Sequence, residues 1–491
     1  MREITPSLLI ATTSLAVILG LRWSEHAILL ALISSSIPFA VAIACSYSHR
    51  RSSLFRKALL LGLGLILGSC LGLRVVIQAS STYAGLPLHR VSSLQGFMRE
   101  DSRGTATGQI LHRIDLFSVA SADGTVSRAR GEVVLFDRSD RKFYTGEVVW
   151  VRGTVKLKDN RPERYFIGSA HAVYSNGFAS PLFRFRAMVL KYLVSQIGKM
   201  GHPVSSLFKA LFLGIRDEIP EEMKKGFVAT GTYHFLAISG LHVGIVFLLV
   251  LILLKLLRRR FLRWALASGL LLVYLFLIGP RPSLLRATAT AIVAGLSVLM
   301  DRDPDPFNLF GLVLLLVLLI NPTSVFSLAF QLSFLSIAGI LFIGRALSRR
   351  VATVIPTVIR VPLACAVGAQ LATAPIVITS FGVHYPVGII VTAILIPMIT
   401  VFIWGGVVVL ILLPIAPSWL VELGRAGLHM LYTTILSVVG WFSNTPGLTR
   451  WFLPYYWYLL GIAIGLLVLS SLGLRQRRYG TMDRRGRNCE L

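Results

Sequence analysis

Long apolar segments alternate with short charged ones over most of the chain. An α-helix needs about 20 apolar residues to cross a bilayer, and many of these segments approach or exceed that length. The pattern predicts a polytopic α-helical membrane protein with about 12 spans. The predicted spans are residues 8–21, 27–44, 58–77, 230–254, 261–279, 284–300, 307–320, 325–343, 359–378, 387–413, 423–442 and 454–474.

The region between residues 79 and 178 breaks this pattern. Charged residues occur throughout it, and apolar and polar residues alternate with a period of two, as in half-buried strands. We expect five strands, at residues 104–112, 115–120, 131–136, 147–156 and 168–174. Together with the glycine-bounded tract at 145–153, they predict a small β-barrel of the OB-like kind.

A mixed segment follows this region. Apolar and cationic residues interleave from Leu182 to Val194, as in an amphipathic helix that lies on a membrane surface. The expected organisation has five parts. They are three N-terminal transmembrane helices (1–78), the OB-like domain (79–178), interfacial amphipathic helices (179–229), the main transmembrane domain (230–474) and a basic tail (475–491).

Composition supports the membrane assignment, and charge adds a topology. The chain is 55% hydrophobic and 14% charged, whereas soluble domains are about 25% charged. The formal net charge is +27, and much of it lies in runs at 49–57, 255–263, 345–350 and 475–487. Because such runs chiefly mark cytoplasmic loops, we favour topology over nucleic-acid contact for them. This places residues 79–178 outside and the tail inside.

Familiar catalytic and metal signatures are missing from the sequence. The four cysteines (Cys45, Cys70, Cys365 and Cys489) are scattered and suggest neither a disulfide framework nor a zinc site. No Gly-x-x-x-x-Gly-Lys, His-Glu-x-x-His or His-x-His pattern occurs. We therefore expect no cofactor and no built-in nucleotide motor.

A polar motif interrupts the apolar pattern at residues 231–244. His234, Ser239 and His242 lie there within a segment of spanning length. Removing an imidazole or a hydroxyl from water without a partner costs a few kcal/mol, on the order of 2–7. These side chains are therefore expected to face a protein interior or a water-filled path rather than lipid.

The motif resembles the signature of the ComEC competence family, the inner-membrane channels of bacterial DNA uptake. Residues 234–243 match nine of the ten positions of His-Leu-Leu-Ala-Ile-Ser-Gly-Leu-His-Val. Four further stretches are similar to the family. They are 210–220, where Arg216 and Asp217 stand in exchanged order, 279–287, which holds Arg281 and Arg286, 321–336, and 369–382.

The resemblance and the polar positions give the candidate residues. Those expected along the path are His234, Ser239, Gly240, His242, Arg281, Arg286, Gln331, Ser333 and Gln370. Several alternatives stay open: Arg286 could extend to the interface, Gln331 and Ser333 could hold helices together, and the histidines could bind a metal.

The OB-like domain carries its own candidates for contact with DNA. They are Trp150, Arg152, Lys156 and Lys158. Aromatic residues here, including Phe136, Phe143, Tyr144 and Phe166, could stack bases or fill the core. Lys and Arg outnumber Asp and Glu by only 13 to 10 between residues 97 and 174. We therefore expect weak binding of single strands with a shallow salt dependence.

The resemblance implies a channel that passes single-stranded DNA across the cytoplasmic membrane of a bacterium. It also implies membrane lipids, a separate DNA receptor, a nuclease and a cytoplasmic motor as partners, and a homo-oligomer is an open alternative. Many relatives end in a metallo-β-lactamase-like domain, whereas about 17 residues follow the last predicted span here, so we expect no enzymatic activity. The alternative is a permease for a small anionic solute or lipid precursor, although such carriers rarely need a barrel domain.

Overall fold

The computed structural model describes residues 6–20, 52–80, 83–84, 87–105, 108–139, 141–160, 163–279, 281–351 and 356–449. The chain divides into two compact units. The first comprises residues 1–221, 234–331 and 400–433, and the second residues 222–233, 332–399 and 434–491. The predicted spans 27–44 and 454–474, and the basic tail, lie outside the described residues.

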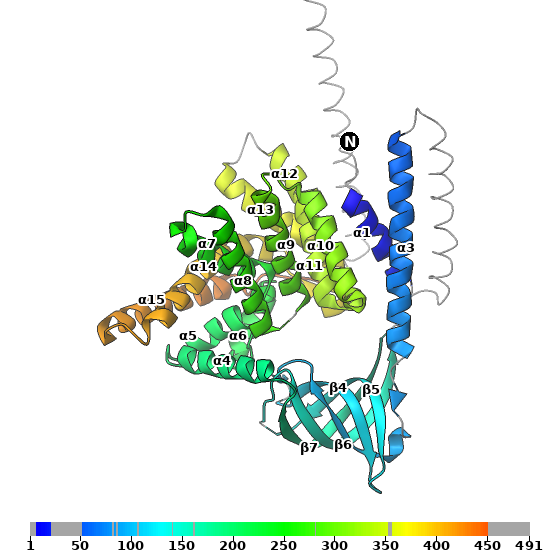
Figure 1. The fold of residues 1–491 in the computed structure, drawn as a ribbon. Coiled ribbons are helices and arrows are strands. Elements are labelled where there is room, and N and C mark those ends of the chain that lie inside the picture. Colours follow the sequence, from blue (N-terminus) through cyan, green and yellow to red (C-terminus); the bar gives the residue numbers. More distant parts are fainter. Residues whose placement is uncertain are drawn as a thin grey trace, which may run out of the picture. The chain divides into compact units, whose positions relative to one another are not determined.

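The first unit contains a closed β-barrel (Figure 1). Its five main strands are β2 (Val91–Met98), β4 (Ile110–Ser121), β5 (Val126–Asp137), β6 (Glu147–Asn160) and β7 (Glu163–Phe178). They pair in the order β5-β7-β6-β2-β4, and β4 pairs with β5 to close the ring. The β5–β7 pair is parallel, whereas the other four pairs are antiparallel. Short β1 (Tyr83–Ala84) and β3 (Arg103–Gly104) add to β5 and β4. The predicted barrel is confirmed.

Period-two alternation explains which side chains fill the barrel. Along β6, Val149, Val151 and Val155 are buried, whereas Arg152 and Lys156 are exposed on the other face. The interior is an aliphatic core with two aromatic side chains, Phe143 and Phe166. These two of the candidate aromatics therefore belong to the core. A closed ring leaves no long unpaired strand edge among the five main strands.

The predicted strand boundaries were partly wrong. Residues 104–112 and 115–120 were predicted as two strands, but a single strand, β4, runs through Arg113 and Ile114 without a turn. Its alternation is unbroken there, and no Gly or Pro interrupts it. The strand β2 was not predicted, because its sequence VSSLQGFM has two adjacent serines and a glycine in place of regular alternation.

The helices of the first unit form two packed groups. They are α1 (Pro6–Gly20), α3 (Ser52–Ser80), α4 (Pro181–Gly198), α5 (Val204–Phe208), α7 (Gly240–Leu253), α8 (Arg260–Ile278), α9 (Pro282–Leu299) and α10 (Pro306–Ile320). Helix α1 packs on α3 and α10, and α7 packs on α8 and α9. Small residues allow α1 and α3 to approach closely, since Ser14 Oγ donates to the carbonyl of Gly64 at 2.8 Å.

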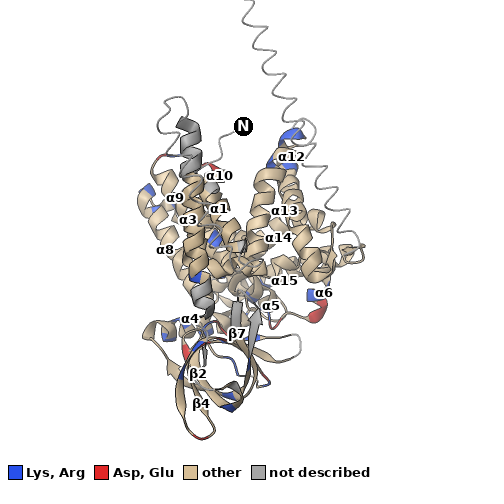
Figure 2. Ribbon diagram, turned by 90° about the vertical axis from the view of Figure 1, so that its right-hand side faces the viewer, with Lys and Arg blue, Asp and Glu red and all other residues tan. Residues whose placement is uncertain are grey.

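Five helices among the described residues are long and apolar enough to cross a membrane. They are Arg260–Ile278, Pro282–Leu299, Leu328–Arg350, Thr357–Phe381 and Gly388–Leu412. Shorter apolar helices cover Leu60–Val75, Gly240–Leu256 and Pro306–Ile320. In Figure 2 the ribbons of α13 and α14 carry few charged residues, whereas α12 carries several cations. The chain is a helical membrane protein, and the predicted count of about 12 spans is not confirmed.

The second unit is built on helices that contact through glycine. Its elements are α6 (Glu221–Ala229), most of α11 (Leu328–Gly339), a π-helical turn (Ile340–Gly344), α12 (Arg345–Arg350), α13 (Thr357–Phe381) and the strand pair β8–β9 (Val383–His384, Leu448–Thr449). Helices α14 (Gly388–Leu412) and α15 (Ser418–Phe442) contribute to both units. A Cβ atom built on Gly339 would lie 2.0 Å from the carbonyl oxygen of Gly368, so only glycine permits this approach.

Candidate functional site

The polar motif begins helix α7 rather than lying within it. The segment 230–254 was predicted as one span, but α7 starts at Gly240, and Ser239 caps it with extended backbone. Both the backbone N–H of Ser239 and its hydroxyl approach Nδ1 of His242, at 3.1 and 2.9 Å. Because Nδ1 accepts from the backbone N–H, the proton of the neutral ring lies on Nε2. That atom is buried and has no hydrogen-bond partner among the described residues.

Arg286 lies on α9 against the start of α7. Its side chain is buried, with 7% of its surface exposed. A Cβ atom built on Gly240 would lie 2.6 Å from Arg286 Nη2, so the glycine makes room for the guanidinium. Ser283 ties the two helices together at the same level, because its hydroxyl donates to the carbonyl of Ile238 at 3.0 Å. The geometry brings Ser239, Gly240, His242 and Arg286 into one cluster.

Arg281 caps α9 and packs against a second glycine. Its Nη2 donates a long hydrogen bond of 3.5 Å to the carbonyl of Gly214. Gly214 has φ of 73°, and a Cβ atom on it would lie 2.5 Å from Arg281 Nη1. The Nε atom of Arg281 is buried without a hydrogen-bond partner among the described residues. Two arginines thus enter an apolar bundle at one end of α9, each beside a glycine.

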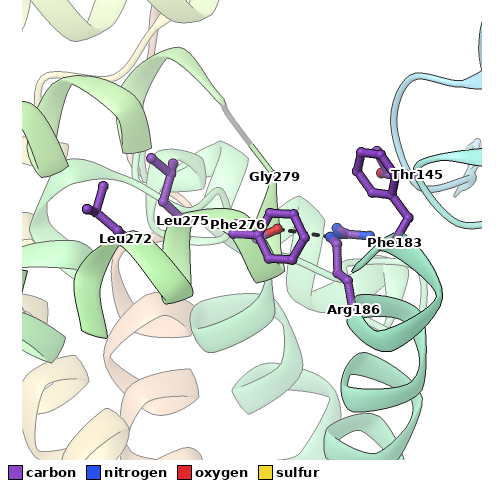
Figure 3. Close-up of a pocket in the computed structure, with 7 residues that line it drawn as sticks. All are labelled: Thr145, Phe183, Arg186, Leu272, Leu275, Phe276 and Gly279. Carbon is purple, nitrogen blue, oxygen red and sulfur yellow. Dashed lines mark hydrogen bonds between the residues drawn. The ribbon is translucent and has the colours of Figure 1, made fainter. Parts of the chain in front are cut away.

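Arg186 of α4 is a second buried arginine, and it joins the barrel to α8. Its Nη1 and Nη2 donate to the two carboxylate oxygens of Asp101 at 2.8 Å each, and its Nε donates to the carbonyl of Phe276 at 2.9 Å. Thr145 donates twice to the same Asp101. Figure 3 shows Arg186 beside an apolar pocket of about 260 Å³. The pocket is lined by Thr145, Phe183, Arg186, Leu272, Leu275, Phe276 and Gly279.

The pKa of Asp101 reflects this arrangement. Burial alone would raise the pKa of its carboxyl group. The hydrogen bonds and positive charge of Arg186, with the two hydrogen bonds from Thr145, outweigh burial and lower the pKa below 3.8.

Helix α4, predicted to lie on the membrane surface, turns one of its cations, Arg186, inward. Its exposed face carries Leu182, Phe185, Met188 and Tyr192.

Comparison with family models settles the class of this protein. Residues 211–476, more than half of the chain, match the Competence protein family. The chain belongs to the Competence protein family. The resemblance drawn from the polar motif is thereby confirmed.

Three proteins similar to this competence-family chain define how far the likeness extends. An uncharacterized protein of Aquifex aeolicus is 30% identical over 54% of this chain and 59% of its own length. ComE operon protein 3 of Bacillus subtilis is 29% identical over 47% of this chain and 30% of its own. The uncharacterized protein YcaI of Escherichia coli is 29% identical over 31% and 21%. This chain therefore covers less than two thirds of each relative. No solved structure matches it.

The family match divides the candidate residues. Gly214, Gly240, His242, Arg281 and Arg286 lie inside the matched range, whereas the barrel and Arg186 lie before it. His234 is exposed in a short turn before α7, with its ring 4.5 Å from that of Phe235. It differs from His242 in being exposed, although both lie in the same unit.

The remaining polar candidates of the competence-family chain are Gln331, Ser333 and Gln370. Gln331 donates from Nε2 to the carbonyl of Val325 at 3.0 Å, within its own connection. Ser333 and Gln370 belong to the second unit. The hydroxyl of Ser333 and Oε1 of Gln370 are buried without hydrogen-bond partners among the described residues. Gln331 is thus held by a contact of its own in the first unit, and Ser333 and Gln370 are described only within the second unit.

The barrel candidates share one outward face of β6. Arg152 lies over the ring of Trp150 at 4.8 Å from its centroid, and Trp150 packs on Tyr174 at 5.5 Å. Lys156 is exposed on the same face, and the side chain of Lys158 lies outside the described residues. Trp150 therefore does not belong to the barrel core.

A serine, a histidine and an aspartate meet inside the barrel, which sequence reasoning did not foresee. Ser102 Oγ lies 2.9 Å from His112 Nδ1, and His112 Nε2 lies 3.4 Å from Asp137 Oδ2. Ser102 also accepts from the N–H of Phe143 at 2.8 Å, and its side chain is buried. Burial lowers the pKa of His112, and the hydrogen bond to Asp137 offsets part of this effect. We interpret the group as structural, because a substrate cannot reach a buried hydroxyl that is already engaged.

Among the described residues, no group of three or more His, Cys, Asp or Glu side chains is placed to hold a metal ion.

Proposed function

We propose that this protein passes single-stranded DNA inward across the cytoplasmic membrane of a bacterium. The barrel would face the outside and receive the strand, and the helices around α9 would conduct it. The observation that carries the proposal is the pair of guanidinium groups at one end of α9 beside the polar start of α7, that of buried Arg286 and that of half-buried Arg281. Membership of the Competence protein family supports the same role.

The physical reason is electrostatic. A phosphate chain that leaves bulk water loses solvation, so it needs positive charge or hydrogen-bond donors wherever water becomes scarce. Arg281, Arg286 and the Nε2 hydrogen of His242 are such donors, and all three lie within one unit. Receptor, nuclease and motor would be separate proteins, and the path itself would carry out no hydrolysis.

Deletion of the gene tests the proposal directly. We expect that labelled DNA still binds to the cell surface but no longer enters the cytoplasm. Normal entry of DNA in the deletion strain would contradict the proposal. If DNA entry were normal and uptake of a small anion were lost, the protein would be a permease instead.

Substitutions of Arg286 test the site. Arg286→Gln should lower cytoplasmic DNA per molecule of inserted protein, because attraction rather than packing is lost. Arg286→Lys should fall between wild type and Gln, since an ammonium group meets a phosphate but cannot make a bidentate contact. Equal uptake by all three proteins would show that Arg286 is an anchor for the helix and not part of the path.

The absence of hydrolysis is tested with the purified protein. We expect no cleavage of single- or double-stranded DNA in magnesium, manganese or zinc. Cleavage that co-purifies with the protein through several steps and is abolished by chelation would identify it as an enzyme.

A further inference from the structure

The segment between Gly214 and Glu218 connects the barrel to the end of α9. Gly104 of β3 lies against it, because a Cβ atom on Gly104 would be 3.4 Å from Asp217 Cγ. Lys142 of the barrel forms an ion pair with Asp217, and Lys209 forms one with Glu218. On its other side the segment contacts Arg281 through Gly214. We call the place where β3, this segment and Arg281 meet the junction.

The carboxylates of the junction are already paired with other cations. Glu100 pairs with Arg103 and with Arg113. Asp101 binds Arg186, Asp217 binds Lys142, and Glu218 binds Lys209. Among the described residues no carboxylate forms an ion pair with Arg281. Its single hydrogen bond, to a carbonyl, leaves its charge without a counter-charge at contact distance.

Two further arginines act on Arg281. Burial and the charges of Arg103 and Arg216 lower the pKa of Arg281, Glu100 and Asp101 oppose them, and the net result is a pKa of about 10. The guanidinium is still protonated at pH 7. Positive groups from three separate segments, namely β3, the segment after Gly214 and the cap of α9, therefore lie within electrostatic range of one another. Glu100 pairs with Arg103, whereas Arg281 has no carboxylate at contact distance among the described residues, so an anion bound there would stabilise its charge.

We infer that Arg103, Arg216 and Arg281 bind successive phosphodiester groups of a single strand at the junction, where it passes from the barrel to α9. The inference rests on the proposed function and adds two arginines to its path. It also moves the route to the β3 side of the barrel.

Binding by the full-length protein in nanodiscs tests this inference. A fluorescent 30-residue oligothymidylate is titrated against wild type and against Arg103→Gln, Arg216→Gln and Arg281→Gln at several salt concentrations. Each substitution should weaken binding about three- to tenfold at low salt and reduce the slope of affinity against salt by nearly one. Arg128→Gln is the matched control, since Arg128 is an exposed arginine of β5 on the same barrel; its affinity should change less than twofold.

The lysine variants distinguish a lost DNA contact from misfolding, and the lipid composition distinguishes DNA binding from binding of lipid headgroups. Arg103→Lys, Arg216→Lys and Arg281→Lys should recover part of the affinity, which a merely misfolded protein would not do. Binding equal to wild type in the three Gln variants, or an equal loss in Arg128→Gln, would overturn the inference. An effect seen only in discs with phosphatidylglycerol, and not in phosphatidylcholine alone, would assign the site to lipid headgroups. If wild type takes up DNA normally and the three variants do too, this route fails while the proposed function stands.

Discussion

Arg186 and Arg281 lie in the same unit, and their surroundings are opposite: Arg186 is buried, whereas Arg281 is half-buried. Arg186 makes three hydrogen bonds of 2.8 to 2.9 Å and a bidentate ion pair with Asp101. Arg281 makes one hydrogen bond of 3.5 Å and no ion pair among the described residues. The first is fully compensated for its loss of water, and the second is not.

This difference separates a structural cation from a functional one. A buried charge with a complete set of partners fixes a geometry, and removing one partner is costly. A buried charge with few partners lowers stability and is retained only if another anion binds it part of the time. Arg186 therefore fixes the barrel to α4 and α8, whereas Arg281 is the arginine that we propose binds the DNA. The following predictions test this contrast on stability, from the largest effect to the smallest.

Arg186→Met should destabilise the protein by about 3 kcal/mol, because Asp101 loses its cation. The value is at the lower end for a buried pair, since 29% of the Asp101 side chain is exposed. Thermal unfolding in detergent measures the change. Arg113→Met is the control, because Arg113 is 44% exposed and makes a surface ion pair; it should cost less than about 1 kcal/mol. Similar losses in both variants would contradict the structural role of Arg186.

Acidification should remove part of the same stabilisation. The pKa of Asp101 is lower in the folded protein than its ordinary value of 3.8. Its contribution is therefore complete above that value and is lost as the pH falls through the lower, folded pKa. The stability difference between wild type and Asp101→Asn should narrow between pH 5 and pH 2.5. A difference that stays constant over this range would show that the ion pair contributes little.

Gly214→Ala should cost about 1–2 kcal/mol, because φ of 73° is unfavourable for a residue with a Cβ atom. The new methyl group would also displace Arg281. We expect uptake per inserted molecule to fall more than stability does. Gly108→Ala is the control: its φ is 75° with open space around it, so it should cost similar stability and leave uptake unchanged. A parallel loss of uptake in Gly108→Ala would remove the link to Arg281.

Arg281→Met should change stability least, by about 0.5 kcal/mol or less, and it could raise stability, because a poorly compensated buried charge is removed. Uptake should nevertheless fall about tenfold, since one phosphate contact is lost at each step of transport. Thermal unfolding and DNA uptake are measured on the same preparations. A destabilisation as large as that of Arg186→Met would mean that the two arginines are alike.

The fold could be predicted where the patterns are long and regular. Helices α8, α9, α13 and α14 follow the predicted apolar segments within three residues at each end, and the barrel follows from period-two alternation. The start of α7 was placed ten residues too early, because hydropathy does not register that Ser239 and the side chain of His242 form a cap. Strand β2 was missed because its pairing with β4 and β6, not its own sequence, makes it a strand.

Of the arginines at the candidate site, only those in or beside an apolar segment could be predicted from the sequence. Arg281 and Arg286 stand out because they lie beside or within an apolar segment. Arg103, Arg186 and Arg216 look like ordinary surface cations in charged stretches, and only the tertiary structure shows Arg186 buried and the other two near Arg281. The roles of Gly214 and Gly240 are likewise set by the side chains opposite them. The periodicity of helix α4 could have indicated that Arg186 faces inward.

The short length of α7 has a consequence for the energy of transport. With the 3-10 turn Leu254–Leu256 that continues it, α7 rises about 27 Å, slightly less than the hydrocarbon core of a bilayer, which is about 30 Å thick. If α7 spans the membrane in the proposed channel, lipid thins slightly beside it or water reaches below the headgroups, toward the level of Ser239 and His242. The low-dielectric layer is then thinner on this side of the protein than elsewhere. A charged polymer guided there would meet a lower solvation barrier before it contacts a single arginine.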